Sequence, residues 1–313
     1  MPIPAPRDSG FTTTTAVPLY WAAYGTPGAP RMLVLHGGPG ASHDYLLPQL
    51  LRLAERHDVL FYDQRGGGRS RTDGRAPVTW RTHVADVAAV VRELGLAAAP
   101  LRLAGYSWGA LLAMLYQIEV GGGRSEVGTS SGTHAHLPPP TSHLLLIDPA
   151  PITRAWRDEF EAAFALRSAA PAVRALREAL AASGLRERDP DGYKQRAFEL
   201  SVAGYFADPA RARDLTPFRV VGRVQQEVWA SLGDYDLRPA LAGVRVPRAL
   251  VVHGRQDPIP LESSAAAARA LGASLVVLEE CGHVPYVEQP AALFAAVDAF
   301  LAGPDRPPSH PAG

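Results

Sequence analysis

The chain has 313 residues, of which 47% are hydrophobic and 20% are charged, the balance of an ordinary globular protein. Its 31 basic and 31 acidic residues cancel, and no long basic run is present, so the composition argues against binding of nucleic acid. A single cysteine, Cys281, excludes an intramolecular disulfide and a cysteine-based metal cluster. We expect the partner to be a small molecule or a short peptide.

The chain also carries no signal for a membrane. No window approaches the roughly 18 consecutive apolar residues that span a bilayer. Residues 1–7 lack the charged-then-apolar order of a signal peptide. These features predict a cytoplasmic protein without membrane contact, and they leave the oligomeric state open.

Short apolar runs alternate with helical patterns, which predicts an α/β fold with a mostly parallel central sheet. Residues 11–16 and 19–24, separated by Val17-Pro18, predict an opening antiparallel hairpin. The strands expected after this hairpin are the wholly or mostly apolar segments 32–35, 59–62, 101–104, 144–147, 249–252 and 274–278. Apolar residues at helical spacing predict helices at 44–55, 79–94, 110–118 and 291–301.

Two segments interrupt this alternation. Residues 121–140 are rich in Gly, Ser, Thr and Pro and lack periodicity, which predicts a disordered surface insertion. Residues 152–240 are rich in Ala, Arg, Leu and aromatic residues but contain no strand-like run, which predicts a helical cap between two strands. Residues 1–151 and 241–313 would then form one core.

The segment 105–109 (GYSWG) lies between a predicted strand and a predicted helix, the context of a G-x-S-x-G nucleophile elbow. Such a turn is tight, and side chains at the two glycine positions would collide with neighbouring backbone. The turn lifts Ser107 clear of the sheet and sets it at the N-terminus of a helix, where negative charge is favoured. Ser107 is therefore the candidate nucleophile.

A neutral serine hydroxyl needs a base within hydrogen-bond reach, and that base needs an orienting acid. In an α/β-hydrolase fold the chain order is Ser, then Asp or Glu, then His. Asp257 and His283 each follow a predicted strand, so both should project from the sheet edge where Ser107 lies. Asp148 also ends a strand ahead of a proline and is the alternative acid.

The segment 36–40 (HGGPG) follows the first buried strand and predicts an oxyanion loop. The oxyanion of an acyl-transfer intermediate needs two N–H donors in a water-poor pocket. We assign these donors to the N–H groups of Trp108 and Gly38, with Gly37 as the alternative to Gly38.

We expect neither a metal nor a cofactor. The spacing of three histidines in and beside the predicted insertion invites a metal site, but no carboxylate or cysteine joins them. These histidines are His134, His136 and His143.

Three segments together resemble the proline iminopeptidases of the α/β-hydrolase superfamily: 36–40 (HGGPG), 63–70 (DQRGGGRS) and 105–109 (GYSWG). The resemblance implies cofactor-free release of an N-terminal residue, often proline, from short peptides. Asp63 and Arg65 look like the pair that stabilises a loop in that family. Cap glutamates hold the free amino group of the substrate in the family, and Glu227 looks like one of them.

Cap aromatics could line an apolar substrate pocket, although packing in the cap core is the more ordinary role for each of them. The candidates are Trp156, Phe160, Phe164, Tyr205, Phe206 and Trp229. Of these, we assign Trp229 to substrate binding together with Glu227.

One position departs from the family pattern, since Pro258 stands where a second glutamate commonly follows the catalytic aspartate. Loss of one of two carboxylates should weaken the hold on an ammonium group. Three functions remain open: an aminopeptidase for N-terminal proline or another small apolar residue, an esterase, lactonase or amidase without an amine requirement, and a non-catalytic binding protein on the same fold.

Overall fold

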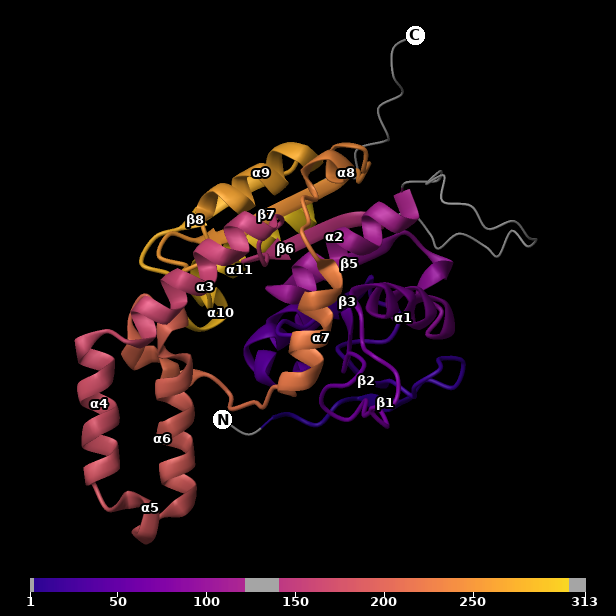
Figure 1. Cartoon of the computed structure of the whole chain (residues 1–313). Coiled ribbons are helices and arrows are strands. Elements are labelled where there is room, and N and C mark those ends of the chain that lie inside the picture. Colours follow the sequence, from indigo (N-terminus) through magenta and orange to yellow (C-terminus); the bar gives the residue numbers. More distant parts are fainter. Residues whose placement is uncertain (1–2, 122–140, 304–313) are drawn as a thin grey trace.

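The structure is a computed structural model that describes residues 3–121 and 141–303. Its centre is an eight-stranded sheet in the order β1-β2-β4-β3-β5-β6-β7-β8, in which only the pairings made by β2 are antiparallel (Figure 1). This mostly parallel sheet confirms the predicted fold class. The strands are β1 (Asp8–Phe11), β2 (Tyr20–Tyr24), β3 (Arg31–Leu35), β4 (Asp58–Tyr62), β5 (Leu101–Tyr106), β6 (Thr141–Ile147), β7 (Arg248–Gly254) and β8 (Ser274–Leu278).

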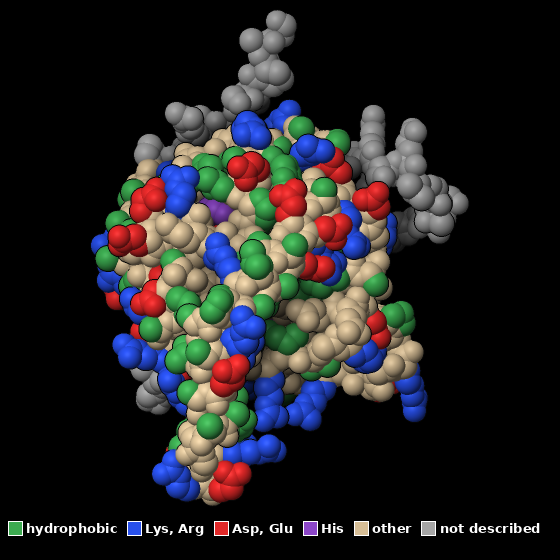
Figure 2. All heavy atoms as spheres, turned by 60° about the vertical axis from the view of Figure 1, so that its left-hand side comes forward, with side chains coloured by type: hydrophobic (Ala, Val, Ile, Leu, Met, Phe, Trp, Pro, Cys, Tyr) green, Lys and Arg blue, Asp and Glu red, His purple; other side chains and the backbone are tan. Residues whose placement is uncertain are grey.

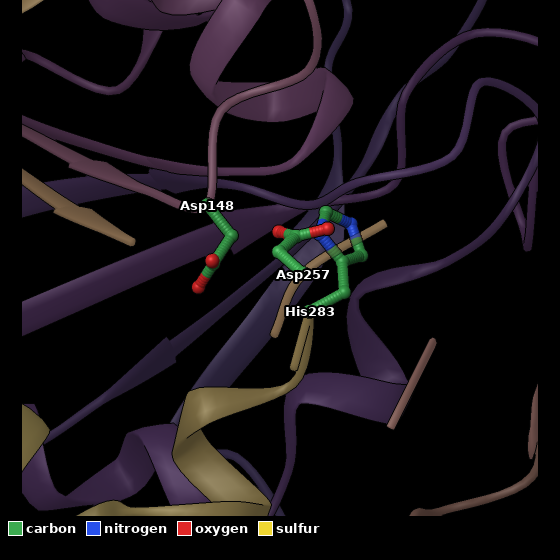
Figure 3. Close-up of side chains that lie close together, drawn as sticks. All are labelled: Asp148, Asp257 and His283. Carbon is green, nitrogen blue, oxygen red and sulfur yellow. The ribbon is translucent and has the colours of Figure 1, made fainter. Parts of the chain in front are cut away.

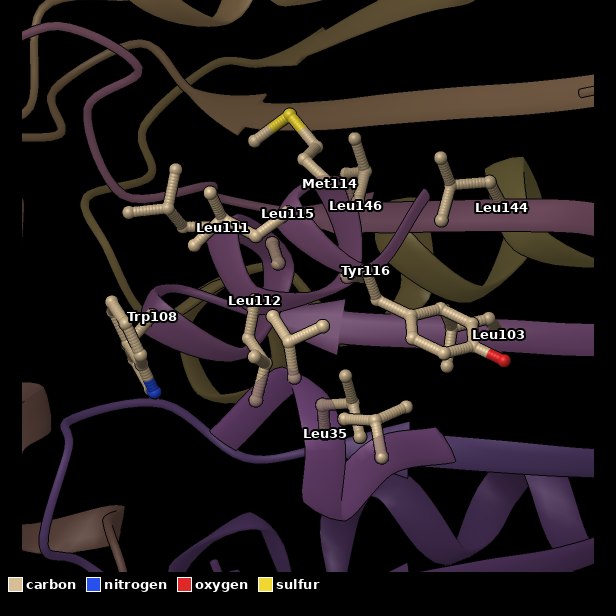
Figure 4. Packing of buried hydrophobic residues seen from close by; sticks show 14 of the residues in the cluster. Leu35, Leu103, Trp108, Leu111, Leu112, Met114, Leu115, Tyr116, Leu144 and Leu146 are labelled. Carbon is tan, nitrogen blue, oxygen red and sulfur yellow. The ribbon is translucent and has the colours of Figure 1, made fainter. Parts of the chain in front are cut away.

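Both faces of the sheet are covered, because successive residues of each buried strand point to opposite sides. Leu33 and Leu35 of β3 belong to one hydrophobic cluster, whereas Met32 and Val34 belong to the other. The first cluster includes side chains of α1 (Trp80–Glu93), α2 (Trp108–Gly121) and α9 (Leu261–Leu271), and Figure 4 shows α2 packed on the sheet. The second includes η1 (His43–Leu46), η2 (Gln49–Glu55) and α11 (Pro290–Ala302).

Helix α1 begins and ends as its sequence predicts. Thr79 is the N-cap, and a capping box joins its side chain and backbone to those of Thr82. Gly95 follows the helix with a φ of 65°, a left-handed conformation that glycine adopts at little cost. Val87 and Val91 lie on the buried stripe, and burial of such a side chain contributes about 1.5–3 kcal/mol.

The opening hairpin and the first helical segment differ from the prediction. β1 ends at Phe11, because the backbone N–H groups of Thr13 and Thr14 donate to the carboxylate of Glu93 on α1 and so leave the sheet. Residues 44–55 form the two short 3₁₀ helices η1 and η2, which are separated around Pro48. The first difference arises from a contact that apolar spacing does not encode, and the second lies at Pro48, which has no backbone N–H to continue a helix.

Between β6 and β7 the described chain contains helices and an isolated β-bridge, and none of the eight strands. Helices α4 and α6 lie side by side and project from the body with α5 at their tip, and we call these three helices the cap arm (Figure 1). The elements of this region are α3 (Arg154–Ser168), α4 (Pro171–Ala182), α5 (Leu185–Arg188), α6 (Pro190–Val202), η4 (Ala203–Tyr205), η5 (Pro209–Asp214), α7 (Gly222–Leu232) and α8 (Arg238–Ala242). The limits 152–240 for a separate cap remain a prediction.

Hydrophobic and charged side chains are interspersed over the cap arm and the neighbouring surface (Figure 2). Leu176 on α4 is 48% exposed, and Leu166 at the end of α3 is 76% exposed. The predicted insertion at 121–140 lies almost entirely outside the described residues. Within the described ranges, no helix combines the length and the apolar character needed to cross a bilayer.

Candidate active site

Ser107 lies on the turn between β5 and α2, with a φ of 54° that is unusual for a residue with a side chain. The turn needs its glycines, since a Cβ on Gly109 would lie 2.1 Å from the backbone carbonyl oxygen of Leu35. The Ser107 N–H donates to the carbonyl of Ile147 on the neighbouring strand β6, at 3.0 Å. Packing and backbone hydrogen bonds therefore hold the hydroxyl above the sheet edge.

His283 and Asp257 meet Ser107 at this edge, as the chain order predicts. His283 Nε2 lies 2.9 Å from Ser107 Oγ, and His283 Nδ1 lies 2.7 Å from Asp257 Oδ2. Asp257 is a hydrogen-bond acceptor, so Nδ1 carries the proton and Nε2 is left to accept from the serine. This arrangement can transfer a proton from Ser107 to His283.

The histidine is held in a nearly dry setting. Its backbone N–H donates to the carbonyl of Tyr205 at 2.7 Å, and its carbonyl accepts from the hydroxyl of Tyr106 at 2.8 Å. Burial lowers the pKa of His283 to about 4, and the nearby carboxylate of Glu288 opposes that shift. The imidazole is therefore neutral at neutral pH, which is the form that can act as a base.

Two backbone N–H groups near Ser107 lack an acceptor among the described residues, those of Trp108 and Gly38. The N–H of Gly37, by contrast, donates to the hydroxyl of Tyr45 at 2.7 Å. This bond favours Gly38 over Gly37 as the second oxyanion donor. Tyr45 escaped the sequence reasoning because nothing local marks a tyrosine eight residues away as the partner of this loop.

A network of buried polar groups stabilises the oxyanion loop. The backbone N–H of Gln64 donates to His36 Nε2 at 3.0 Å, and the Gln64 side chain joins the carbonyl of His36 to the indole N–H of Trp108. The network therefore connects the loop to the residue that follows Ser107.

Asp63 and Arg65 both have the structural, loop-stabilising contacts that the resemblance implies, and each residue bonds a different partner. Asp63 bonds His43, with 2.7 Å between Oδ1 and Nδ1. Arg65 reaches α1, with 2.8 Å between its Nε and the carboxylate of Asp86. Each residue therefore anchors the loop after β4 to a different element, Asp63 to η1 and Arg65 to α1.

Glu288, in α10 (Pro285–Glu288), joins the histidine loop to the cap side of the site and was also missed from sequence. This buried carboxylate accepts N–H groups from Gly282, Ala207 and Asp208, at 2.7, 2.8 and 3.1 Å. The ring of Tyr205 lies 5.2 Å from the ring of His283. Residues of the segment between β6 and β7 thus pack directly against the catalytic histidine candidate, His283.

Glu227 and Trp229 have structural partners. Glu227 accepts the N–H of Val78 at 2.9 Å and pairs with Arg223 at 2.6 Å. The ring of Trp229 lies 5.2 Å from that of Trp108, and the guanidinium of Arg157 on α3 lies over the Trp229 ring, 4.1 Å from its centroid. Both side chains hold α7 in position, and neither contacts Ser107 or His283 through a bond or ring contact among the described residues.

Of the three histidines whose spacing invites a metal site, the structure describes only His143. His134 and His136 lie outside the described residues. His143 is buried in β6, with 3.0 Å between its Nδ1 and Ser142 Oγ.

The parallel sheet, the serine on its strained turn and the adjacent histidine and aspartate together define a class of hydrolase fold. Residues 32–297 match the model of the alpha/beta hydrolase family, and the chain belongs to that family.

Among known proteins the chain is similar to the proline iminopeptidase of Levilactobacillus brevis, with 29% identity over 88% of this chain and 89% of that protein. The crystal structure of proline iminopeptidase from Mycobacterium smegmatis has a TM-score of 0.65 at 22% identity and covers 94% of this chain and 97% of its own. The enol-lactonase of Burkholderia xenovorans LB400 has a TM-score of 0.60 at 21% identity over 94% of this chain and 100% of its own. The two structures support the fold alone.

Proposed function

We propose that the protein is a serine hydrolase that works through an acyl-enzyme, with Ser107 as nucleophile, His283 as general base and Asp257 as the orienting acid. The observation that carries the proposal is the chain of two hydrogen bonds from Ser107 Oγ through the imidazole to the Asp257 carboxylate, at 2.9 and 2.7 Å. These are the distances at which proton transfer to a base is effective.

In the proposed reaction, Ser107 Oγ bonds to the substrate carbonyl carbon while its proton moves to His283 Nε2. The carbonyl electron pair becomes an oxyanion, which the N–H groups of Gly38 and Trp108 stabilise. Collapse of this intermediate breaks the bond to the leaving group, which takes the proton from His283. Water then repeats the two steps, releases the acid and restores Ser107.

A fluorophosphonate probe tests this chemistry without knowledge of the substrate. We expect the probe to label the protein at Ser107, as peptide mapping would reveal, and the variant Ser107→Ala to remain unlabelled. A folded wild-type protein that resists the probe would favour the non-catalytic binding function instead.

For the substrate, we propose an aminopeptidase that releases N-terminal proline or another small apolar residue from short peptides. The extended similarity to the Levilactobacillus brevis proline iminopeptidase supports this choice. In this proposal Glu227 holds the substrate amine, with Trp229 nearby. Glu227 would first have to exchange its bonds to Val78 and Arg223 for the ammonium group.

A second candidate is an esterase, lactonase or amidase that needs no free amine. It is favoured by the pairing of Glu227 with Arg223, which already neutralises the carboxylate, and by Pro258 in place of a second acid. The same serine chemistry applies to both candidates.

Activity on proline anilide and on a matched acyl ester without an amine separates the two candidates. If Glu227 binds the amine, Glu227→Gln raises KM for the anilide and spares the ester, while Glu178→Gln on the exposed face of α4 changes neither. An equal loss on both substrates would remove Glu227 from amine recognition, and turnover of the ester alone would establish the second candidate.

A further inference from the structure

A second aspartate lies directly behind the proposed triad. Asp148 follows β6, is completely buried, and has a φ of 40°, which is rare for a residue with a side chain. Its Oδ1 accepts the N–H of Gly254 at 2.8 Å. No N–H or O–H group of the described residues donates to its Oδ2. A buried carboxylate oxygen without a donor is costly, so this atom needs an explanation.

The neighbour of Asp148 is another carboxyl group. Oxygens of Asp148 and Asp257 and a ring nitrogen of His283 all lie within 4.8 Å of one another. Figure 3 shows Asp148 beside Asp257, with His283 on the other side of Asp257. Two ionised carboxylates this close in a buried site repel each other, and a single shared proton removes the repulsion and bonds the orphaned oxygen.

We propose that Asp148 is protonated and donates its O–H to Asp257, so that the buried pair holds one negative charge behind His283. Asp148 is then a positioning residue that acts through Asp257.

The hydrogen bonds decide which aspartate keeps the proton. Burial raises the pKa of Asp257 to about 7, and two hydrogen bonds that favour its ionised form oppose this rise. Asp257 accepts from His283 at 2.7 Å and from the N–H of Ile259 at 2.7 Å. Within the part of the chain that the structure describes, Asp148 accepts only the N–H of Gly254. Burial raises the pKa of Asp148 well above its usual value, and the nearby charge of Asp257 raises it further.

Among the described residues, no other titratable or charged group around the pair supplies a positive charge that would compensate an ionised Asp148. His253 lies 3.7 Å from Asp148, but burial lowers the pKa of its imidazole to about 4, so it is neutral. Arg167 acts on Asp257 rather than on Asp148. Among the described residues, the remaining groups that act on the pair are Tyr106, Tyr205, Cys281, Tyr286 and Glu288.

The single charge has a role in the proposed reaction, and this step rests on the proposed function. An imidazolium forms when His283 takes the serine proton, and one negative charge behind it stabilises that cation. A second charge would also stabilise the imidazolium before reaction, and the histidine would then be less available as a base. The proton on Asp148 thus keeps His283 neutral in the resting protein.

The variant Asp148→Asn tests the charge of Asp148 because its amide mimics the protonated acid but cannot ionise. Its oxygen can accept from Gly254 and its NH₂ can donate to Asp257. We expect the acid limb of the pH profile of kcat/KM to stay where it is in the wild type. If Asp148 were ionised, the substitution would remove a negative charge close to His283, and a shift of the acid limb to lower pH by about one unit or more would overturn the proposal.

The variant Asp148→Ala separates hydrogen bonding from charge. It removes the donor to Asp257, and we expect kcat to fall by about 10- to 100-fold. In Asp148→Asn, whose amide can still donate to Asp257, we expect kcat to stay within an order of magnitude of the wild type. The conservative variant would then rescue the activity that Asp148→Ala loses. Equal losses of kcat in the two variants would overturn the role of the donated hydrogen bond.

Infrared spectroscopy tests the proton without any substrate, so its outcome is independent of the proposed function. At mildly alkaline pH, the difference spectrum of wild type against Asp148→Asn should contain the C=O stretch of a protonated carboxyl group. Glu288→Gln is the matched control, since that buried carboxylate accepts three N–H groups and should contribute no such band. Absence of the band from the Asp148→Asn difference overturns the proposal even if Ser107 proves reactive.

Discussion

The proton on Asp148 should make the stability of the protein depend on pH in a way that Asp148→Asn removes. An unfolded aspartate has a pKa of about 3.9 and releases its proton well below neutrality. The folded protein retains the proton, because burial and the charge of Asp257 raise the pKa of Asp148. The folded state therefore binds one proton more than the unfolded state, and the free energy of unfolding falls as the pH rises between these two pKa values.

One proton corresponds to a slope of about −1.4 kcal/mol per pH unit, or roughly −2.7 kcal/mol between about pH 6 and 8. Asp257 and the other buried acids titrate in both proteins, so their contributions cancel in the comparison of wild type with Asp148→Asn. The variant should lose less stability than the wild type over this interval, by that amount.

Urea unfolding at several pH values, followed by the fluorescence of the five tryptophans, measures the two slopes. Glu178→Gln, which changes an exposed acid, should keep the slope of the wild type. Parallel pH dependences in the wild type and in Asp148→Asn would refute the retained proton.

Three further outcomes follow from the contacts of the site. Tyr45→Phe removes the acceptor of the Gly37 N–H, so the free energy of unfolding should fall by about 1–3 kcal/mol. The value of kcat should fall as well, because the oxyanion loop loses this bond. An unchanged kcat would show that the bond does not hold the oxyanion loop in its active geometry. Glu288→Ala leaves three N–H groups without their acceptor and should destabilise the protein by several kcal/mol in urea unfolding, with a smaller loss for Glu288→Gln; equal stabilities would contradict the bonding. Because burial lowers the pKa of His283 to about 4 and the neutral imidazole is the base, the acid limb of kcat/KM should lie below the ordinary histidine value of about 6.5, and a limb at or above it would contradict this assignment.

The central strands, the elbow and the candidate triad could all be predicted from local features of the sequence. The parallel strands were predictable because most residues of each buried strand are apolar, and the predicted runs at 32–35, 59–62 and 249–252 lie within β3, β4 and β7. The elbow was predictable because a strand that meets G-x-S-x-G must turn tightly into a helix. The meeting of Ser107, Asp257 and His283 was predictable because carboxyl ends of parallel strands share one edge.

Only the tertiary structure decided between the preferred residues and the alternatives that the sequence left open. Asp148 and Asp257 both follow strands that end at the same edge, and the acid that bonds His283 depends on loop geometry across β6, β7 and β8. The oxyanion donor likewise depends on the hydroxyl of Tyr45 from a neighbouring turn. Hydrogen-bond partners of this kind are set by three-dimensional proximity, which neither apolar periodicity nor residue spacing along the chain records.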